Sequence, residues 1–172
     1  LKTMPYIIMV LILFSLLILG FFFYLSYQSL PKYRKDAFSS DIQSIVSIKT
    51  DLYAVPHITG QSDEETYFGL GYVHALERLW QMTYLKRISQ GRLSEISGPE
   101  TVLLDTFMKS LDLQTLAKKN FQNLSPDLKQ ILLSYSKGVN FRLKEIQEQG
   151  LGRGSPEFFF QSPEVTPWSP VD

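Results

Sequence analysis

The chain has no cysteine among its 172 residues, and its 17 basic and 17 acidic side chains balance. Without a thiol it has no disulfide, no thiolate nucleophile, no lipoprotein anchor and no cysteine-based metal site. With no net charge, nothing in the overall electrostatics points to nucleic acid as a partner. The length predicts one domain, and because the chain opens with Leu1 rather than Met we expect a fragment of a longer protein.

Histidine is also scarce, since His57 and His74 are the only two. They lack the H-x-x-x-H and H-E-x-x-H spacings that bind zinc. The spacing leaves a Ser-His-Asp triad open, although no G-x-S-x-G motif supports one. We interpret each histidine as a structural residue that is held by hydrogen bonds.

Charge is missing altogether from residues 3–31, and residues 6–27 are almost wholly aliphatic or aromatic. About 20 apolar helical residues cross a hydrocarbon core of about 30 Å, whereas the apolar region of a signal peptide has only about 7–15. No small-residue cleavage site follows, and Tyr24, Tyr27 and Tyr33 resemble an interfacial aromatic belt. We predict a transmembrane anchor, residues 1–30.

The charges beside this segment bear on its orientation. Lys32, Arg34 and Lys35 follow it and only Lys2 precedes it, which by the positive-inside rule favours a cytoplasmic C-terminal side. A large domain can override such a small bias, so the charges alone leave the side open.

The next stretch, residues 31–44, is polar and is predicted to be a juxtamembrane linker. Residues 45–50 are rich in β-branched side chains and predict a strand. Residues 51–54 are predicted to turn the chain, and residues 55–58 to form the returning strand. Pro56 lacks a backbone donor and therefore suits an edge or a strand end. One hairpin is too small for a stable sheet, so we expect partner strands from elsewhere.

A long helix is predicted to begin at a capping box, Ser62 with Glu65, and to continue through residues 69–82. One stripe of this helix is expected to lie in the core: Val73, Leu76, Leu79, Trp80 and Thr83. Of these, Val73, Leu76 and Trp80 are expected to face the sheet.

The helix is predicted to end in a turn bounded by Gly91 and Gly98, which both suit left-handed positions at helix ends. Arg92 and Glu95 lie three residues apart in this turn and could pair. We expect Glu95, like Arg78, to hold loops in place.

Other features of this region are weak motifs. The Gly-Leu-Gly run at residues 69–71 is too short for a dinucleotide loop. Glu77 and Arg78 are by default solvated helix charges, and Arg87 and Arg92 are equally consistent with surface cations. We therefore infer no phosphate site here.

Two more helices are predicted. One covers residues 105–120, and the other begins with Ser125 as N-cap and Pro126 at the first helical position. The second has apolar side chains at helical spacing: Leu128, Leu132, Tyr135, Val139, Leu143 and Ile146. Residues 150–155 contain three glycines and are expected to form a loop, and an irregular aromatic and proline-rich tail follows.

Taken together, these residues resemble the N-terminal part of the penicillin acylase (penicillin amidase) family. The resemblance covers residues 46–172 in the family's order and spacing, through residues 46–58, 69–82, 91–98 and 167–172 and several shorter pieces, Asp105 among them. The positions that we assign to the family's structural motif are Asp51, Pro56, His57, Gly71, Tyr72, Arg78, Trp80, Gln81, Arg92, Glu95, Gly98 and Asn140. The set is specific, although no single piece would suffice.

Two positions depart from the family pattern. Ala54 stands where the family usually has glycine, and it would strain the hairpin turn if that position requires a positive φ. Glu77 stands where the family usually has aspartate, which keeps the charge but adds a methylene group.

The resemblance implies an α+β fold, the N-terminal part of the four-layer αββα sandwich of N-terminal nucleophile hydrolases. A short β-hairpin and then mainly helices would follow the transmembrane helix, and residues 45–172 would form an incomplete penicillin-acylase-like domain. The resemblance also implies a precursor, or zymogen, that is cut into two chains. A serine at the start of the second chain attacks with its own α-amine as base.

The resemblance also implies where the chemistry lies. Gly154-Ser155 is unsuited as the processing junction, because Pro156 would remove a backbone donor after the nucleophile. The nucleophile is therefore expected downstream of Asp172, and no catalytic and no metal-binding residue is expected in this chain. No cofactor is needed for the chemistry, and calcium would bind through residues beyond Asp172.

The expected partners are the membrane, through residues 5–27, the downstream chain of the same precursor, and a small amide substrate. That substrate would be a β-lactam side chain or an acyl-homoserine lactone. Family members are generally exported, so we expect a single-pass membrane protein with an extracytoplasmic soluble domain. The alternative is a non-catalytic, membrane-tethered scaffold or binding module.

Overall fold

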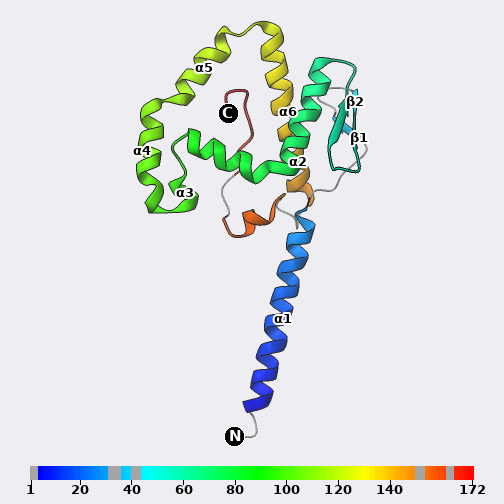
Figure 1. Ribbon diagram of the computed structural model, residues 1–172, viewed down its shortest axis with the longest axis vertical. Coiled ribbons are helices and arrows are strands. Elements are labelled where there is room, and N and C mark those ends of the chain that lie inside the picture. The colour runs from blue at the N-terminus through cyan, green and yellow to red at the C-terminus, as the bar shows by residue number, and fades with distance from the viewer. Residues whose placement is uncertain (1–3, 31–35, 40–43, 150–153, 162–164) are drawn as a thin grey trace.

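The computed structural model describes residues 4–30, 36–39, 44–149, 154–161 and 165–172. A long first helix projects from a body that consists of one small sheet and several helices (Figure 1). In chain order, the elements are α1 Met4–Gln28, β1 Asp36–Ser39, β2 Ser44–Thr50, β3 Pro56–Thr59, α2 Asp63–Ser89, α3 Ser94–Ser97, η1 Pro99–Thr101, α4 Val102–Leu111, α5 Leu113–Asn123, α6 Pro126–Gln149 and η2 Pro156–Phe159.

Helix α1 coincides with the uncharged stretch of the sequence. Its 25 residues extend for about 37 Å at about 1.5 Å per residue, and none of them is buried. It is long and apolar enough to cross a membrane, a test that a signal sequence near an N-terminus also passes. Lys2, Tyr33 and the cations that bear on orientation lie outside the described residues.

The sheet is antiparallel and has the strand order β1-β2-β3. The predicted hairpin is confirmed as β2 and β3, which pair from Ser47 opposite Thr59 to Thr50 opposite Pro56. The prediction of a linker over residues 31–44 is wrong for Asp36–Ser39, which form β1 along β2. A polar edge strand is hard to recognise in a sequence, because its pairing depends on backbone groups rather than on apolar side chains.

Helix α2 begins at the predicted capping box. The Ser62 hydroxyl accepts a hydrogen bond from the Glu65 amide at 3.2 Å, and the Glu65 carboxylate accepts one from the Gln61 amide at 2.5 Å. The helix does not continue straight, because Arg78 has non-helical angles, φ −135° and ψ 23°. The first half of α2 lies between the sheet and α6, and the second half turns away toward α3 (Figure 1).

Two clusters of buried side chains correspond to the two halves of α2. In the first, Val73 and Leu76 contact the sheet through Val46 and Ile48, as predicted. Trp80 was predicted to face the sheet as well, and this is wrong: its ring lies 5.2 Å from that of Phe158 in the second cluster. Trp80 follows the kink at Arg78, so the second half of α2 directs it toward the C-terminal segments instead.

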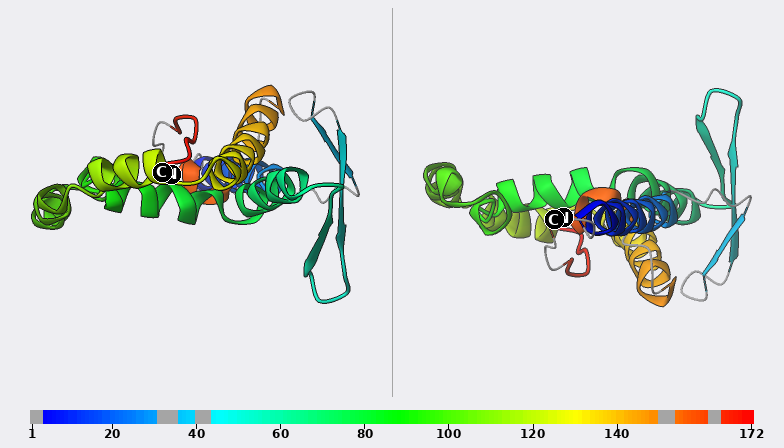
Figure 2. Two further views of the ribbon diagram at one scale, coloured as in Figure 1. Left: turned by 90° about the horizontal axis from the view of Figure 1, so that it is seen from above. Right: turned by 90° about the horizontal axis from the view of Figure 1, so that it is seen from below.

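Helices α2 and α6 approach each other closely through two glycines. A Cβ atom added at Gly71 would overlap the carbonyl oxygen of Tyr135, and one added at Gly138 would overlap that of Phe68. Only glycine at both positions lets the two backbones come this near, since packed interiors leave no space for an extra methyl group. Figure 2 shows that the helices all lie on one side of the sheet.

The remaining helices follow the predictions in part. Helix α6 begins at Pro126, and the Ser125 hydroxyl accepts a hydrogen bond from the Leu128 amide at 3.4 Å. The prediction of a single helix over residues 105–120 is wrong, because Asp112 adopts left-handed angles and separates α4 from α5. Aspartate tolerates this conformation better than most residues do, which helical spacing alone does not reveal.

We predict that Gly138→Ala destabilises the body by about 2–3 kcal/mol, because overpacking against a backbone carbonyl outweighs the gain in helix propensity of about 1 kcal/mol. Urea unfolding followed by tryptophan fluorescence measures the effect, since both tryptophans pack in the second cluster. Gly20→Ala is the matched control, because nothing lies within 4 Å of a Cβ at that position. Equal unfolding midpoints for the two variants would contradict the close approach.

Candidate functional site

The residues of the structural motif gather in three places. Asp51 and His57 close the hairpin turn, whereas Arg92, Glu95 and Gly98 lie in the turn around α3, at the opposite end of the body (Figure 1). Pro56 begins β3 beside the hairpin turn, and the others lie along α2 and α6 between these two ends. No cluster of three or more His, Cys, Asp or Glu side chains that could hold a metal ion occurs in the described ranges.

Asp51 holds the hairpin turn together. Its carboxylate accepts hydrogen bonds from the amides of Tyr53 at 2.8 Å and Val55 at 2.9 Å, and lies 3.1 Å from Nε2 of His57. The hydrogen bonds from the Val55 amide and from His57 keep the pKa of Asp51 below its usual value. Ala54 has a φ of 60°, so this turn does require the positive angle that glycine usually supplies.

His74 is the other histidine, and its Nδ1 lies 3.0 Å from the hydroxyl of Tyr135. Each histidine thus has a hydrogen-bonding partner, as predicted. Burial raises the pKa of Tyr135, so its hydroxyl stays protonated at neutral pH. Among the described residues, neither histidine forms a nucleophile–base pair with a serine.

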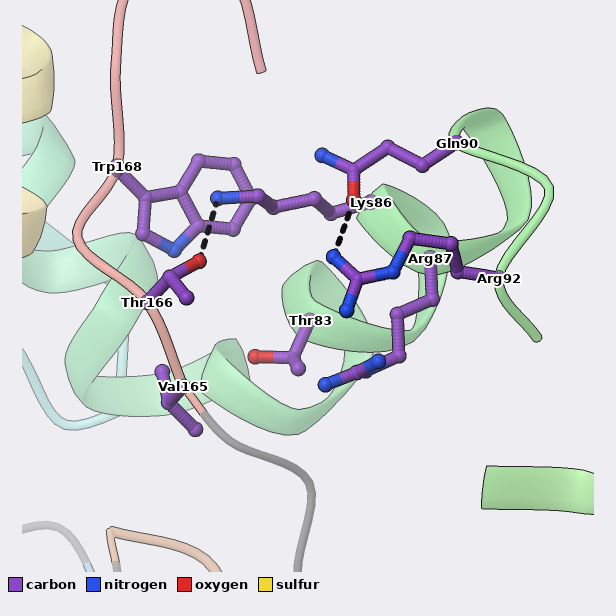
Figure 3. Close-up of a pocket in the computed structure, with 8 residues that line it drawn as sticks. All are labelled: Thr83, Lys86, Arg87, Gln90, Arg92, Val165, Thr166 and Trp168. Carbon is purple, nitrogen blue, oxygen red and sulfur yellow. Dashed lines mark hydrogen bonds between the residues drawn. The ribbon is translucent and has the colours of Figure 1, made fainter. Parts of the chain in front are cut away.

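A polar pocket lies beside the second half of α2 (Figure 3). Its walls come from the end of α2, from the turn that follows and from the C-terminal segment. The lining residues are Thr83, Lys86, Arg87, Gln90, Arg92, Val165, Thr166 and Trp168. Three of these side chains are cations, so the charges opposite them decide what the pocket can do.

Glu95 neutralises two of the cations. It accepts hydrogen bonds from Arg92 Nε at 2.6 Å and Nη2 at 3.0 Å, and it also contacts Nη1 of Arg87. The hydrogen bonds from Arg92 outweigh desolvation and, with those from Arg87, keep the pKa of Glu95 below its usual value. Arg87 is only 6% exposed, so the interpretation of Arg87 as a surface cation is wrong.

Asp105 fixes the same turn from the side of α4. It is buried and accepts hydrogen bonds from the amides of Leu93 at 2.7 Å and Ser94 at 2.8 Å, at the start of α3. Burial by itself would raise the pKa of Asp105, but the hydrogen bonds from Ser94 and Leu93 outweigh it and bring the pKa below the usual value. Both glycines that bound the turn have a positive φ, 61° at Gly91 and 87° at Gly98. The ψ of −179° at Gly98 is extended rather than left-handed helical, so the prediction is wrong in this detail.

Lys86, the third cation, binds the C-terminal segment. Its Nζ lies 3.0 Å from the Asp172 carboxylate, 4.9 Å from the centre of the Trp168 ring, and within hydrogen-bonding distance of Thr166 (Figure 3). Asn140 on α6 forms two hydrogen bonds with the backbone of Trp168: it accepts one from the amide at 2.7 Å and donates one to the carbonyl at 2.9 Å. The cations of the pocket therefore hold chain segments together.

A second hollow, an apolar groove, lies where α2 kinks beside β3. Pro56, Arg78 and Gln81 line it, and Arg78 donates a hydrogen bond to Gln81 at 3.3 Å. The other lining residues are Ile58, Leu70, Val73, His74, Glu77, Met82 and Leu85. The groove is thus largely apolar with a polar rim at the kink.

Tyr72 takes part in a buried polar contact between α2 and α6. Its hydroxyl donates to the Glu145 carboxylate at 3.0 Å, and Arg142 donates to the same carboxylate at 3.1 Å. A buried carboxylate is tolerated where it receives such charge-assisted bonds. This contact stabilises the helix pair and leaves Glu145 engaged as an acceptor.

A family model described as penicillin amidase matches residues 45–172. The chain belongs to the penicillin amidase family. The predicted resemblance is thereby confirmed over residues 45–172. The match begins at the second residue of β2 and leaves out α1 and β1.

Curated relatives of the penicillin amidase family cover most of this chain. An acyl-homoserine lactone acylase QuiP of Pseudomonas aeruginosa is 36% identical over 60% of it. A penicillin acylase 2 proenzyme of a Pseudomonas species is 30% identical over 73% of it, and a penicillin G acylase of Escherichia coli is 32% identical over 66%. The matches span 12%, 16% and 13% of the length of these relatives, respectively.

A solved structure shows the same fold. A thermostable penicillin G acylase from Alcaligenes faecalis superposes with a TM-score of 0.65 and 25% identity, over 73% of this chain and 66% of that one. This match confirms the predicted α+β fold of penicillin acylase type. The described residues contribute one three-stranded sheet and the helices on one of its faces.

From the sequence we did not predict that Arg87 and Lys86 line a polar pocket. Arg87 follows Thr83 by four residues, so the apolar stripe of α2 already placed it on the buried side. Lys86 carries no comparable signal, because its partner Asp172 lies 86 residues further along. Long-range ion pairs of this kind do not appear in helical periodicity.

We predict that Glu95→Gln lowers the free energy of unfolding at pH 7 by about 1–2 kcal/mol, because it leaves the buried Arg87 without its counter-charge. The loss is smaller than for a fully buried pair, since the Glu95 side chain is 45% exposed and water screens it. Because folding lowers the pKa of Glu95, its contribution is present above the unfolded pKa of about 4.3 and is lost as the pH falls through the folded value.

The wild-type protein and Glu95→Gln should therefore converge in stability below about pH 4. Urea unfolding at a series of pH values measures this. Glu100→Gln, at an exposed position five residues further along, is the matched control and should follow the wild-type curve. A constant difference between wild type and Glu95→Gln down to pH 3 would overturn the assignment.

Proposed function

We propose that the intact protein is a membrane-anchored amidohydrolase and that this chain forms part of its scaffold. The observation that carries the proposal is the family match over residues 45–172, joined to relatives that are named as acylases. The described residues supply helix-packing contacts, a turn network and a bound C-terminal segment. Each of these contacts holds a backbone segment in place rather than a reacting group.

The proposed reaction is hydrolysis of the linear amide bond of an acylated substrate. The relatives' names support two substrate classes, acyl-homoserine lactones and penicillins with their acyl side chains. An N-terminal serine beyond Asp172 acts as nucleophile, with its own α-amine as base and nearby donors to stabilise the oxyanion. The proenzyme name of one relative supports a precursor that is processed into two chains.

The chemistry needs no cofactor, since the amine of the nucleophile supplies the base. Calcium would bind through residues beyond Asp172 and act on the fold rather than on the reaction. We propose the downstream chain of the same precursor as the main protein partner. The apolar groove at the kink supports this, because an exposed apolar surface rimmed by polar residues often marks an interaction surface.

Helix α1 supports a single-pass anchor, with the body on the extracytoplasmic side. In this proposal, residues 1–30 form the anchor and residues 45–172 the first part of the catalytic domain, and the connection between them includes β1. The extracytoplasmic side is proposed from the export that the family resemblance implies, although the charges beside α1 favour the cytoplasm. The alternative remains a non-catalytic, membrane-tethered scaffold or binding module.

The full-length protein is expected to release acid and amine from an acyl-homoserine lactone or from penicillin G, as measured by amine detection with both substrates. Replacing the serine at the start of the second chain by alanine should abolish both precursor cleavage and hydrolysis. Glu100→Gln, which alters an exposed helix charge, should retain both. A folded full-length protein that neither cleaves itself nor hydrolyses any acylated amine would favour the scaffold alternative.

The body is expected to be digested when protease is added outside intact spheroplasts, because it lies beyond the membrane. Detection with antibodies against residues 45–172 measures the loss, and a cytoplasmic protein in the same sample must stay intact. Resistance of the body until the cells are lysed would place it in the cytoplasm and overturn this part of the proposal.

A further inference from the structure

The aromatic turn, residues 158–160, connects the body to α1. The ring of Phe22 lies 5.3 Å from that of Phe160 and 6.3 Å from that of Phe159, both in edge-to-face geometry. These rings bring η2 and α1 into contact, and Figure 1 shows η2 at the end of the body where α1 leaves it. Segments almost 140 residues apart therefore meet at one point.

The three phenylalanines of the turn face two different surroundings. Phe158 is buried in the body, where it packs on Trp80. Phe160 is 74% exposed and contacts the body's anchor helix rather than its core. Phe160 thus adds an exposed aromatic side chain to the continuous apolar surface that α1 already presents, and a contiguous apolar surface of this kind marks an interaction site.

The position of Phe22 along α1 sets the depth of the turn. The segment proposed to lie in the membrane, residues 5–27, ends five residues after Phe22, which is about 7.5 Å along a helix. Rings that pack on Phe22 must lie at nearly the same depth. That depth is the boundary between acyl chains and headgroups, where aromatic side chains are favoured.

We propose that the aromatic turn inserts into the bilayer surface beside α1, with a lipid bilayer as its partner. Phe159 and Phe160 then lie at the acyl boundary, whereas the carboxylate of Glu157, which is exposed and contacts the Ser155 hydroxyl, stays in the headgroup layer. The inference rests on the proposed membrane anchor. It adds a second point of attachment, which holds the body against the membrane surface.

The absence of cysteine makes a direct test available, because any introduced cysteine is the only thiol in residues 1–172. Spin labels at Phe160→Cys, Phe22→Cys and Leu103→Cys report depth when the protein is reconstituted in phosphatidylcholine and phosphatidylglycerol nanodiscs. Oxygen collects in the acyl region and a nickel chelate in water, so the ratio of the two accessibilities measures immersion. Leu103 is the matched control, since it is 82% exposed on α4, away from α1 (Figure 1).

The label at position 160 is expected to be reached more by oxygen than by nickel, like that at position 22, with the opposite preference at position 103. Oxygen preference at position 22 with nickel preference at position 160 overturns the insertion and leaves the anchor standing. Nickel preference at both positions refutes the anchor itself. A label at position 160 that neither reagent reaches indicates a cover of protein, which also overturns the insertion.

Discussion

The close approach of α2 and α6 is the constraint on which the rest of the body depends. Gly71 and Gly138 bring two backbones into direct contact, each opposite a carbonyl of the other helix. Around this crossing, the Tyr72–Glu145–Arg142 contact satisfies the buried polar groups that so tight an interface encloses. The sheet can then pack on only one side of α2, because α6 occupies another. The order of the layers thus follows from two positions that lack a side chain.

The kink at Arg78 divides α2 into two parts. The first part packs on the sheet and on α6, and the second part contributes Leu79 to the second cluster of buried side chains, with Trp80 packed against it. Beside that cluster, ion pairs and hydrogen bonds fix the turn that follows α2. Glu95 joins the end of α2 to α3, Asp105 joins α4 to the same turn, and Lys86 with Asn140 binds the last described segment. A network of this kind fixes irregular backbone, which apolar packing does less specifically.

Much of this could be predicted from the sequence where the signal is local. The capping box at Ser62, the start of α6 at Pro126 and the positive φ angles of Gly91 and Gly98 all depend on neighbouring residues. The errors share a different cause. Strand β1 needs the edge of β2, and the new direction of Trp80 needs the kink. Each depends on a contact in three dimensions that periodicity does not encode.

The same distinction applies to the residues through which the chain resembles its family. Asp51 binds main-chain amides, Asn140 binds the amide and the carbonyl of Trp168, and Glu95 binds the guanidinium groups of two arginines at a turn. Each of these contacts fixes a backbone segment. Asp51 even compensates for the positive φ of Ala54, since its carboxylate binds the two amides that flank this residue. A chain can therefore carry a clear family pattern in the side chains that fix its backbone.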